Sequence, residues 1–249
     1  MSHSAPIFDH VPDAVLPVDH EHPDVNSGWL RASVFGAMDG LVSNFALIAG
    51  MVGGTTAAGA DAHVVVLAGV AGLAAGAFSM AVGEYNSVAS QAEYALAQVA
   101  KERAEIIRNP RGETAELVAM YVDKGVEPDT AEVIAQQIHR DVDRAVTVHA
   151  MEEFGVDPAD VPSPKVAAGS SFLSFAVGAA IPLVPFLVGL PSLWLSLVST
   201  LTALFLCGAV VARVTTRSWW WSGLRPMLLG GAAAAVTYLF GSLVGAGLG

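Results

Sequence analysis

Residues 32–52 read ASVFGAMDGLVSNFALIAGMV, an apolar run in which Asp39 is the only charged side chain. At about 1.5 Å per residue, a helix of this length crosses the hydrocarbon core of a bilayer, which is about 30 Å thick. Asp39 would lie roughly 10 Å from the start of that span, where a carboxylate costs on the order of 2–3 kcal/mol to insert. Such residues usually line an ion path, pair with a partner or bind a cation. The alternative is a helix cap at the membrane interface.

The composition extends this interpretation to the whole chain. The 249 residues are 53% hydrophobic and only 14% charged, and the mean hydropathy is +0.54. The apolar residues gather in runs, which indicates a polytopic membrane protein. The formal net charge of −11 must therefore come from the parts outside the spans. Such an acidic surface argues against nucleic acid or anionic lipid as a partner and is compatible with cations.

Five runs of about twenty residues predict five transmembrane helices. They cover about residues 30–52, 63–90, 166–190, 193–214 and 224–248, and Gly53 and Gly54 are expected to end the first helix. The expected class is an all-α polytopic membrane protein with a helical metal-binding insert. Its expected parts are a disordered cytosolic tail (1–29), two spans (30–90), a cytosolic metal-binding insert (91–165) and three spans (166–249).

The basic residues favour one orientation of these spans. The linker after the fourth span carries Arg213, Arg217 and Arg225, whereas the other short loops and the C-terminus carry no Lys or Arg. The positive-inside rule places this linker in the cytosol. With five spans, the N-terminus and the insert are then cytosolic and the C-terminus is outside.

Prolines and glycines indicate how the spans pack. Pro182 and Pro185 fall inside the third span and predict a kinked or locally unwound helix. Small-xxx-small spacing, which lets helix backbones approach closely, occurs in three glycine pairs: Gly36/Gly40, Gly72/Gly76 and Gly241/Gly245. This spacing leaves two interpretations open, tight packing within one subunit or a seam between two.

The hydrophilic insert is expected to be helical. The second span should continue as a helix to a break at Asn109–Pro110. Another helix should end at Gly125, and one or two more should end at Gly155.

Acidic side chains in the insert recur at i, i+3 or i+4, which places each set on one helix face. The sets are Glu102 and Glu105, Glu113 and Glu116, and His149, Glu152 and Glu153. Like charges on one face repel unless a cation neutralises them, and oxygen ligands with an imidazole suit Mn²⁺, Fe²⁺ and Zn²⁺. Met151 is either an added soft ligand or a core residue. The alternative is a solvated acidic face neutralised by nearby lysines and arginines.

Motifs typical of metalloenzymes are missing. None of the seven histidines has a Glu three positions before it, so the Glu-x-x-His pair of ferritin-like di-iron sites is absent. HExxH and CxxC are absent too, and the lone Cys207 lies in an apolar run. We therefore expect a protein that is not an enzyme, neither a ferroxidase nor a hydrolase.

The second span carries SMAVGEY, in which Met80 and Glu84 are four residues apart on one helix face. On an antiparallel first span, Asp39 would lie at a depth comparable to Met80, with Asn44 about one turn deeper. A carboxylate that faces a thioether favours a borderline transition ion over Mg²⁺ or Ca²⁺. Taken alone, Met80 is also compatible with core packing, and Glu84 with a place among the headgroups.

Four stretches resemble the vacuolar iron transporter (VIT) family: DGLVSNFALIAG (39–50), AGLAAGAFSMAVGEYNSVASQ (71–91), the Glu-rich insert, and GSSFLSFAVGAAIPLVPF (169–186). The resemblance runs from about Leu30 to the C-terminus. It implies a homodimer with five spans per subunit and a pore at the dimer interface lined by Asp39 and Met80. It also implies a cytosolic helical domain whose metal ligands are Glu102, Glu105, Glu113, Glu116 and Glu153. Plant-type members have a Met pair before the last Glu; this chain has HAMEE (149–153), so His149, Met151 or Glu152 would replace the soft ligands.

The resemblance further implies a function. The family exports cytosolic Fe²⁺, and in some members Mn²⁺, in exchange for protons; Zn²⁺ and Co²⁺ also fit the ligand chemistry, and no cofactor is expected. The insert would pass the ion to Glu84, Met80 and Asp39. The rival interpretation is a membrane-anchored metal sensor or store whose spans only anchor and dimerise it. We expect a multi-pass protein of a bacterial plasma membrane, or of a vacuolar membrane in a eukaryote.

Overall fold

The computed structural model describes residues 28–58, 62–215 and 217–248, and within these ranges it contains helices and no strand. Five helices are long and apolar enough to cross a membrane: Trp29–Gly54, Ala62–Arg108, Pro164–Leu187, Leu193–Arg213 and Trp219–Gly247. The predicted all-α class with five candidate spans is confirmed. The predicted disordered tail, residues 1–29, lies almost entirely outside the described residues.

The helices follow one another with short joints. In chain order they are α1 (Gly28–Ala58), α2 (Ala62–Arg108), α3 (Pro110–Asp123), α4 (Pro128–Ile138), α5 (Val142–Phe154), α6 (Pro164–Ala180), the 3₁₀ turn η2 (Ile181–Leu183), α7 (Val184–Leu187), α8 (Leu193–Thr215) and α9 (Trp219–Leu248). Helix α1 packs against α6 and α9 and also contacts α2 and α8, so it occupies the centre of the bundle.

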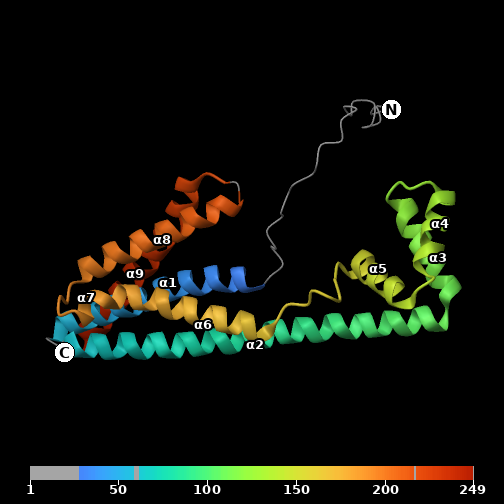
Figure 1. Ribbon diagram of the computed structural model, residues 1–249. Helices are drawn as coiled ribbons and strands as arrows, with labels where there is room; N and C mark the ends of the chain where they lie inside the picture. Colours follow the sequence, from blue (N-terminus) through green and yellow to red (C-terminus); the bar gives the residue numbers. More distant parts are fainter. Residues whose placement is uncertain (1–27, 59–61, 216, 249) are drawn as a thin grey trace.

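Helix α2 joins the two parts of the molecule. Its 47 residues span roughly 70 Å, more than twice the thickness of a bilayer core. Figure 1 shows its first half beside α1 and α6, and its second half running on to α3, α4 and α5. The predicted continuation of the second span into the insert is confirmed, because α2 ends at Arg108, directly before Asn109–Pro110.

The glycines at the end of the first span do not stop the helix, so that expectation was wrong. Helix α1 passes through Gly53 and Gly54 to Ala58. A Cβ at Gly53 would collide with the backbone of Tyr238, and Gly54 lies against Gly241. The missing side chains therefore let α9 approach α1 closely while α1 stays helical.

The small-xxx-small pairs also pack within the chain. Gly241 and Gly245 of α9 lie against the backbone of Gly50 and Gly54 of α1. Gly40 lies against the backbone of Phe175 on α6. These contacts favour the first of the two interpretations left open by the spacing, namely tight packing inside one subunit.

The third span is interrupted where its prolines predict. Helix α6 ends at Ala180, and the 3₁₀ turn η2 leads into the short helix α7. Neighbouring helices bind the carbonyls at this break: Asn44 Nδ2 of α1 donates to the oxygen of Ala179 at 2.7 Å, and Ser196 Oγ of α8 donates to that of Pro182 at 2.7 Å. The hydrogen bonds hold the break in place between α1 and α8.

Capping residues define the helices of the insert. Asn109 Oδ1 accepts from Gly112 N at the start of α3, and Asp141 Oδ1 accepts from Arg144 N at the start of α5. Gly155 ends α5 in the left-handed region, with φ 65°. A small core of Ile106, Ala145 and Val146 holds α5 on α2.

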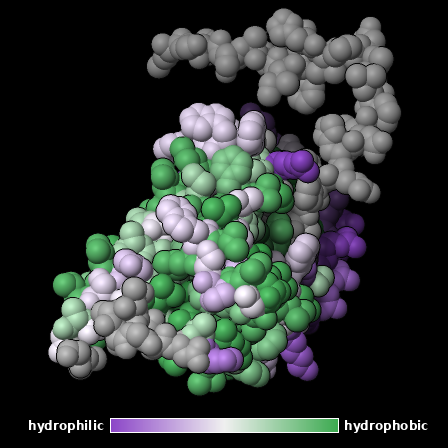
Figure 2. All heavy atoms as spheres, turned by 90° about the vertical axis from the view of Figure 1, so that its left-hand side faces the viewer, coloured by the Kyte–Doolittle hydropathy of each residue, from purple (hydrophilic) through white to green (hydrophobic). Residues whose placement is uncertain are grey.

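The hydropathy of the surface agrees with a bundle that lies in a membrane. Figure 2 looks at the end of the bundle opposite the insert and shows hydrophobic side chains over most of the bundle, with hydrophilic ones gathered at one margin. Helix α9 begins at Trp219 instead of the predicted Leu224, so Trp219, Trp220 and Trp221 form its first turn and are exposed, as a membrane-interface belt requires.

Candidate metal centre and membrane site

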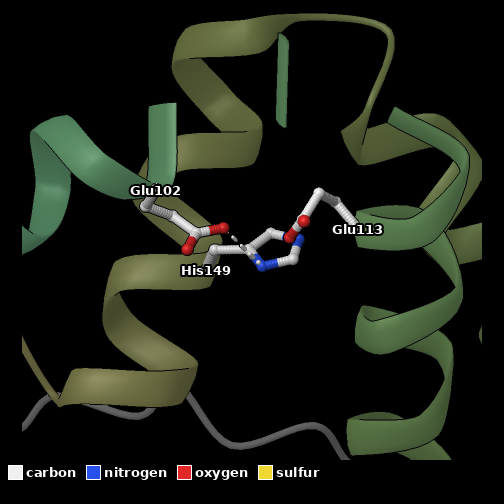
Figure 3. Close-up of side chains that lie close together, drawn as sticks. All are labelled: Glu102, Glu113 and His149. Carbon is white, nitrogen blue, oxygen red and sulfur yellow. Dashed lines mark ion pairs between the residues drawn. The ribbon is translucent and has the colours of Figure 1, made fainter. Parts of the chain in front are cut away.

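Three helices bring together three potential metal ligands in the insert. Glu102 comes from α2, Glu113 from α3 and His149 from α5. One ligand atom of each lies within 4.8 Å of the others. Figure 3 shows the two carboxylates on either side of the imidazole of His149.

His149 is the centre of this cluster. Its side chain is fully buried, and its Nδ1 lies 2.7 Å from Glu153 Oε1 and 3.1 Å from Glu102 Oε1. The other ring nitrogen, Nε2, is buried and has no hydrogen-bond partner among the described residues. Because a buried polar atom without a partner is costly, this nitrogen is chemically suited to a bound cation.

The shifted pKa values of the carboxyl groups in this cluster also favour a bound cation. Burial raises the pKa of Glu102 to about 7, and the nearby charges of Glu153, Glu113 and Glu105 add to the rise, while His149 opposes it. Burial, followed by the charge of Glu116, also raises the pKa of Glu113. With a pKa of about 7, the Glu102 carboxyl holds a proton in part of the molecules at neutral pH, and a bound cation would displace it.

The other predicted ligands of the insert lie around this cluster or away from it. Glu105 lies 3.8 Å from Lys101 and from Arg108, and Glu116 is exposed. Glu152 forms an ion pair with Lys124, and Met151 is 44% exposed. The structure brings Glu153 to His149 but brings neither Glu152 nor Met151 into the cluster.

The sequence alone favours His139 as a surface or packing histidine, whereas the structure brings it next to His149. Its ring packs edge-to-face on that of His149, with 5.2 Å between the ring centroids. Its Nδ1 lies 2.9 Å from the carbonyl oxygen of Ala135, and its Nε2 is buried without a partner in the described part of the chain. A carbonyl at Nδ1 fixes the tautomer that leaves a lone pair on Nε2, which is the form that binds metal. His139 follows α4, so no helical spacing links it to the other ligands.

The spans carry a second polar site between α1 and α2. Asp39 and Met80 line a groove of about 240 Å³. The other lining residues are Ser43, Asn44, Leu47, Gly72, Gly76, Ser79 and Phe175. Asn44 is buried, and its Oδ1 has no hydrogen-bond partner within the described residues. The predicted proximity of Asp39, Asn44 and Met80 is therefore present in the fold.

Glu84 lies apart from this groove. It is 9% exposed and pairs with Arg31 of α1, a partner that sequence reasoning missed. The two residues are 53 positions apart, so only the packing of α1 on α2 brings them together. The pair lies one helical turn from Met80 towards the insert, because α2 runs from the groove to the insert.

These features define a class: a helical protein with five membrane spans, a polar groove inside the spans, and an acidic helical insert carried on an extended second span. The family model described as the VIT family matches residues 30–242. The chain belongs to the VIT family and is a multi-pass membrane protein.

Curated relatives match most of the chain and carry names that agree with this family. It is 39% identical to "Vacuolar iron transporter" of Acanthamoeba castellanii over 218 residues, which are 85% of this chain and 73% of that protein. It is 30% identical to "Vacuolar iron transporter 1" of Eucalyptus grandis, covering 88% of each chain, and 28% identical to the Arabidopsis thaliana protein of that name, covering 86% of each.

Proposed function

We propose that this protein transports Fe²⁺ across a membrane in exchange for protons, and that Mn²⁺ is a second substrate. One observation carries the proposal: the unbroken helix α2 bears Met80 of the membrane groove and Glu102 of the cluster in the insert. A store or sensor would need the cluster but not the groove. The relatives named vacuolar iron transporters supply the identity of the ion.

The insert captures the ion. Glu102, Glu113 and His149 offer two oxygens and one nitrogen within 4.8 Å, a set suited to Fe²⁺, Mn²⁺, Zn²⁺ or Co²⁺. Three further carboxylates surround this set, those of Glu105, Glu116 and Glu153. Because the pKa of Glu102 is about 7, binding releases a proton at neutral pH.

The groove conducts the ion through the spans. Asp39 supplies a carboxylate, Met80 a soft sulfur, and Asn44 an amide oxygen that has no hydrogen-bond partner among the described residues. The ion pair of buried Glu84 with exposed Arg31 lies between the insert and the groove, so the arriving ion would compete with Arg31 for Glu84. Asp39 also accepts the proton that moves the other way.

A second copy of the chain closes the groove. Helix α2 packs on α6 and α1, while side chains such as Phe78, Val82 and Tyr85 on it remain exposed. A groove that holds a carboxylate is costly beside lipid. A homodimer that pairs these faces places two Asp39 and two Met80 residues along one path.

The direction of transport and the membrane that holds the protein are inferred from the basic residues of the linker between α8 and α9 and from the proposed function. The positive-inside rule places Arg213, Arg217 and Arg225, and with them the insert, in the cytosol. The insert then collects cytosolic Fe²⁺ for export, across a plasma membrane in a bacterium or a vacuolar membrane in a eukaryote.

Proteoliposomes with the purified protein test the proposal. Fe²⁺ flux should rise when the compartment opposite the insert is made acidic, and protons should move against the metal. Flux that ignores the pH gradient would overturn proton exchange. Metal binding with no flux at all would overturn transport and favour the sensor or store.

A further inference from the structure

Another cavity, which shares no lining residue with either candidate metal site, lies where α8 and α9 meet α1. It has a volume of about 250 Å³. Arg217 precedes α9, while Trp221, Ser222 and Arg225 belong to its first two turns, and all four line the cavity together with Met38 of α1. This is the end of the bundle from which α2 continues into the insert, as Figure 1 shows.

The two arginines have no counter-ion among the residues that the structure describes. Neither Arg217 nor Arg225 forms an ion pair with any described residue, whereas Arg31 pairs with Glu84. The described parts of the membrane helices contain few acids: Asp39 lines the groove beside α2, and Glu84 is already paired. Two guanidinium groups therefore border one cavity, and none of its described lining residues carries a carboxylate.

We infer that this cavity binds a phosphate group, carried either by an anionic phospholipid headgroup or by free phosphate. Guanidinium groups bind phosphate oxygens through paired N–H donors, and the hydroxyl of Ser222 adds a further donor. Basic pockets between helices at the membrane surface suit anionic headgroups, and exposed Trp219, Trp220 and Trp221 place this end at the interface. The inference is independent of which ion the protein carries.

The chain as a whole is acidic, which argues against anionic lipid, but the charge is unevenly distributed. Within the described ranges, residues 62–90 of α2 and the other four candidate spans carry only two acidic residues, Asp39 and Glu84. The cavity is thus a local basic site on an acidic protein. Because it touches Met38, the neighbour of Asp39, a bound phosphate would hold α8 and α9 against the central helix.

Native mass spectrometry of the full-length protein tests this site, with titrations of phosphatidylglycerol, phosphatidylcholine and inorganic phosphate. The variants are Arg217→Gln, Arg225→Gln and the double variant. Arg213→Gln is the matched control, because Arg213 carries the same charge at the same end but does not line the cavity.

We expect wild type to retain phosphatidylglycerol more strongly than phosphatidylcholine. Each pocket substitution should weaken this binding roughly five-fold, and the double variant about twenty-five-fold, while Arg213→Gln changes it less than two-fold. Phosphatidylglycerol should raise the unfolding temperature of wild type and of Arg213→Gln but not of the double variant. A tight site for inorganic phosphate that the double variant loses would assign the same pocket to free phosphate.

Two results would overturn the inference. One is equal weakening by Arg213→Gln and by the pocket variants, since that would reflect the general basic charge of this end. The other is binding of both anions that the double variant leaves unchanged.

Discussion

His149 on α5 lies with its Nδ1 3.1 Å from Oε1 of Glu102 on α2, and both side chains are buried. This contact joins the last helix of the insert to the helix that enters the membrane. The remaining ring nitrogen of His149 is buried and has no hydrogen-bond partner among the described residues. The pair is therefore suited to bind a cation.

Replacing His149 should impair metal binding. We expect His149→Ala to weaken Fe²⁺ and Co²⁺ binding by roughly ten- to a hundred-fold, the range typical of groups that hold a metal site together. His149→Met, which restores a soft ligand, should recover part of the affinity. Isothermal titration of the full-length protein measures both. The matched control is Glu127→Gln, an exposed acid at the start of α4, which should bind as wild type does; equal losses in both would refute a specific site.

The stability of the metal-free protein should depend on pH through Glu102. Its pKa of about 7 in the folded protein exceeds the ordinary value of 4.5, so between these values the folded state holds a proton that the unfolded chain has lost. The free energy of unfolding therefore falls as the pH rises from about 4.5 through 7, by on the order of 3 kcal/mol. Bound metal should offset this loss above pH 7.

Thermal unfolding with and without metal checks this dependence. Glu102→Gln, which cannot ionise, should show a smaller decline. Stability that is flat or rises over the same range in wild type would contradict the assignment.

His139 should contribute to the same centre. We expect His139→Ala to shift the visible absorption of bound Co²⁺, because a nitrogen ligand is lost, and to weaken binding less than His149→Ala does. His63→Ala, outside the insert, should leave the spectrum unchanged. A Co²⁺ spectrum that His139→Ala does not alter would place this histidine outside the coordination sphere.

Close packing of α9 on α1 should make Gly241 intolerant of a side chain. A Cβ there would collide with the carbonyl of Gly50, so Gly241→Ala should destabilise the protein by about 1–3 kcal/mol. Gly169→Ala, on α6 with open space around it, should be neutral or stabilising. Unfolding in detergent compares the two variants; equal effects would contradict the close contact between α1 and α9.

Much of the fold could be predicted from the sequence. The apolar runs are long enough to identify all five spans, and no Pro interrupts α2 before Asn109–Pro110, while its four glycines leave the helix unbroken. The end of α1 could not be predicted, because Gly53 and Gly54 read as a stop unless a neighbouring helix packs on them.

The contacts within the candidate sites could likewise be predicted only in part. Helical spacing grouped His149 with Glu153, and the contact between them is present. The same spacing also included Glu152, which faces Lys124 instead. The pairing of Arg31 with Glu84 and the proximity of His139 to His149 join different elements, and no local pattern encodes such contacts.

The central claim is that an ion path crosses the spans at Asp39. The most direct test compares Fe²⁺ flux into proteoliposomes that contain wild type or Asp39→Asn. Metal binding by the insert is measured on the same preparations. The Asn variant keeps the shape of the side chain but loses the charge that binds the ion. The account predicts that flux falls at least ten-fold while binding by the insert is unchanged. Undiminished flux in Asp39→Asn would contradict it.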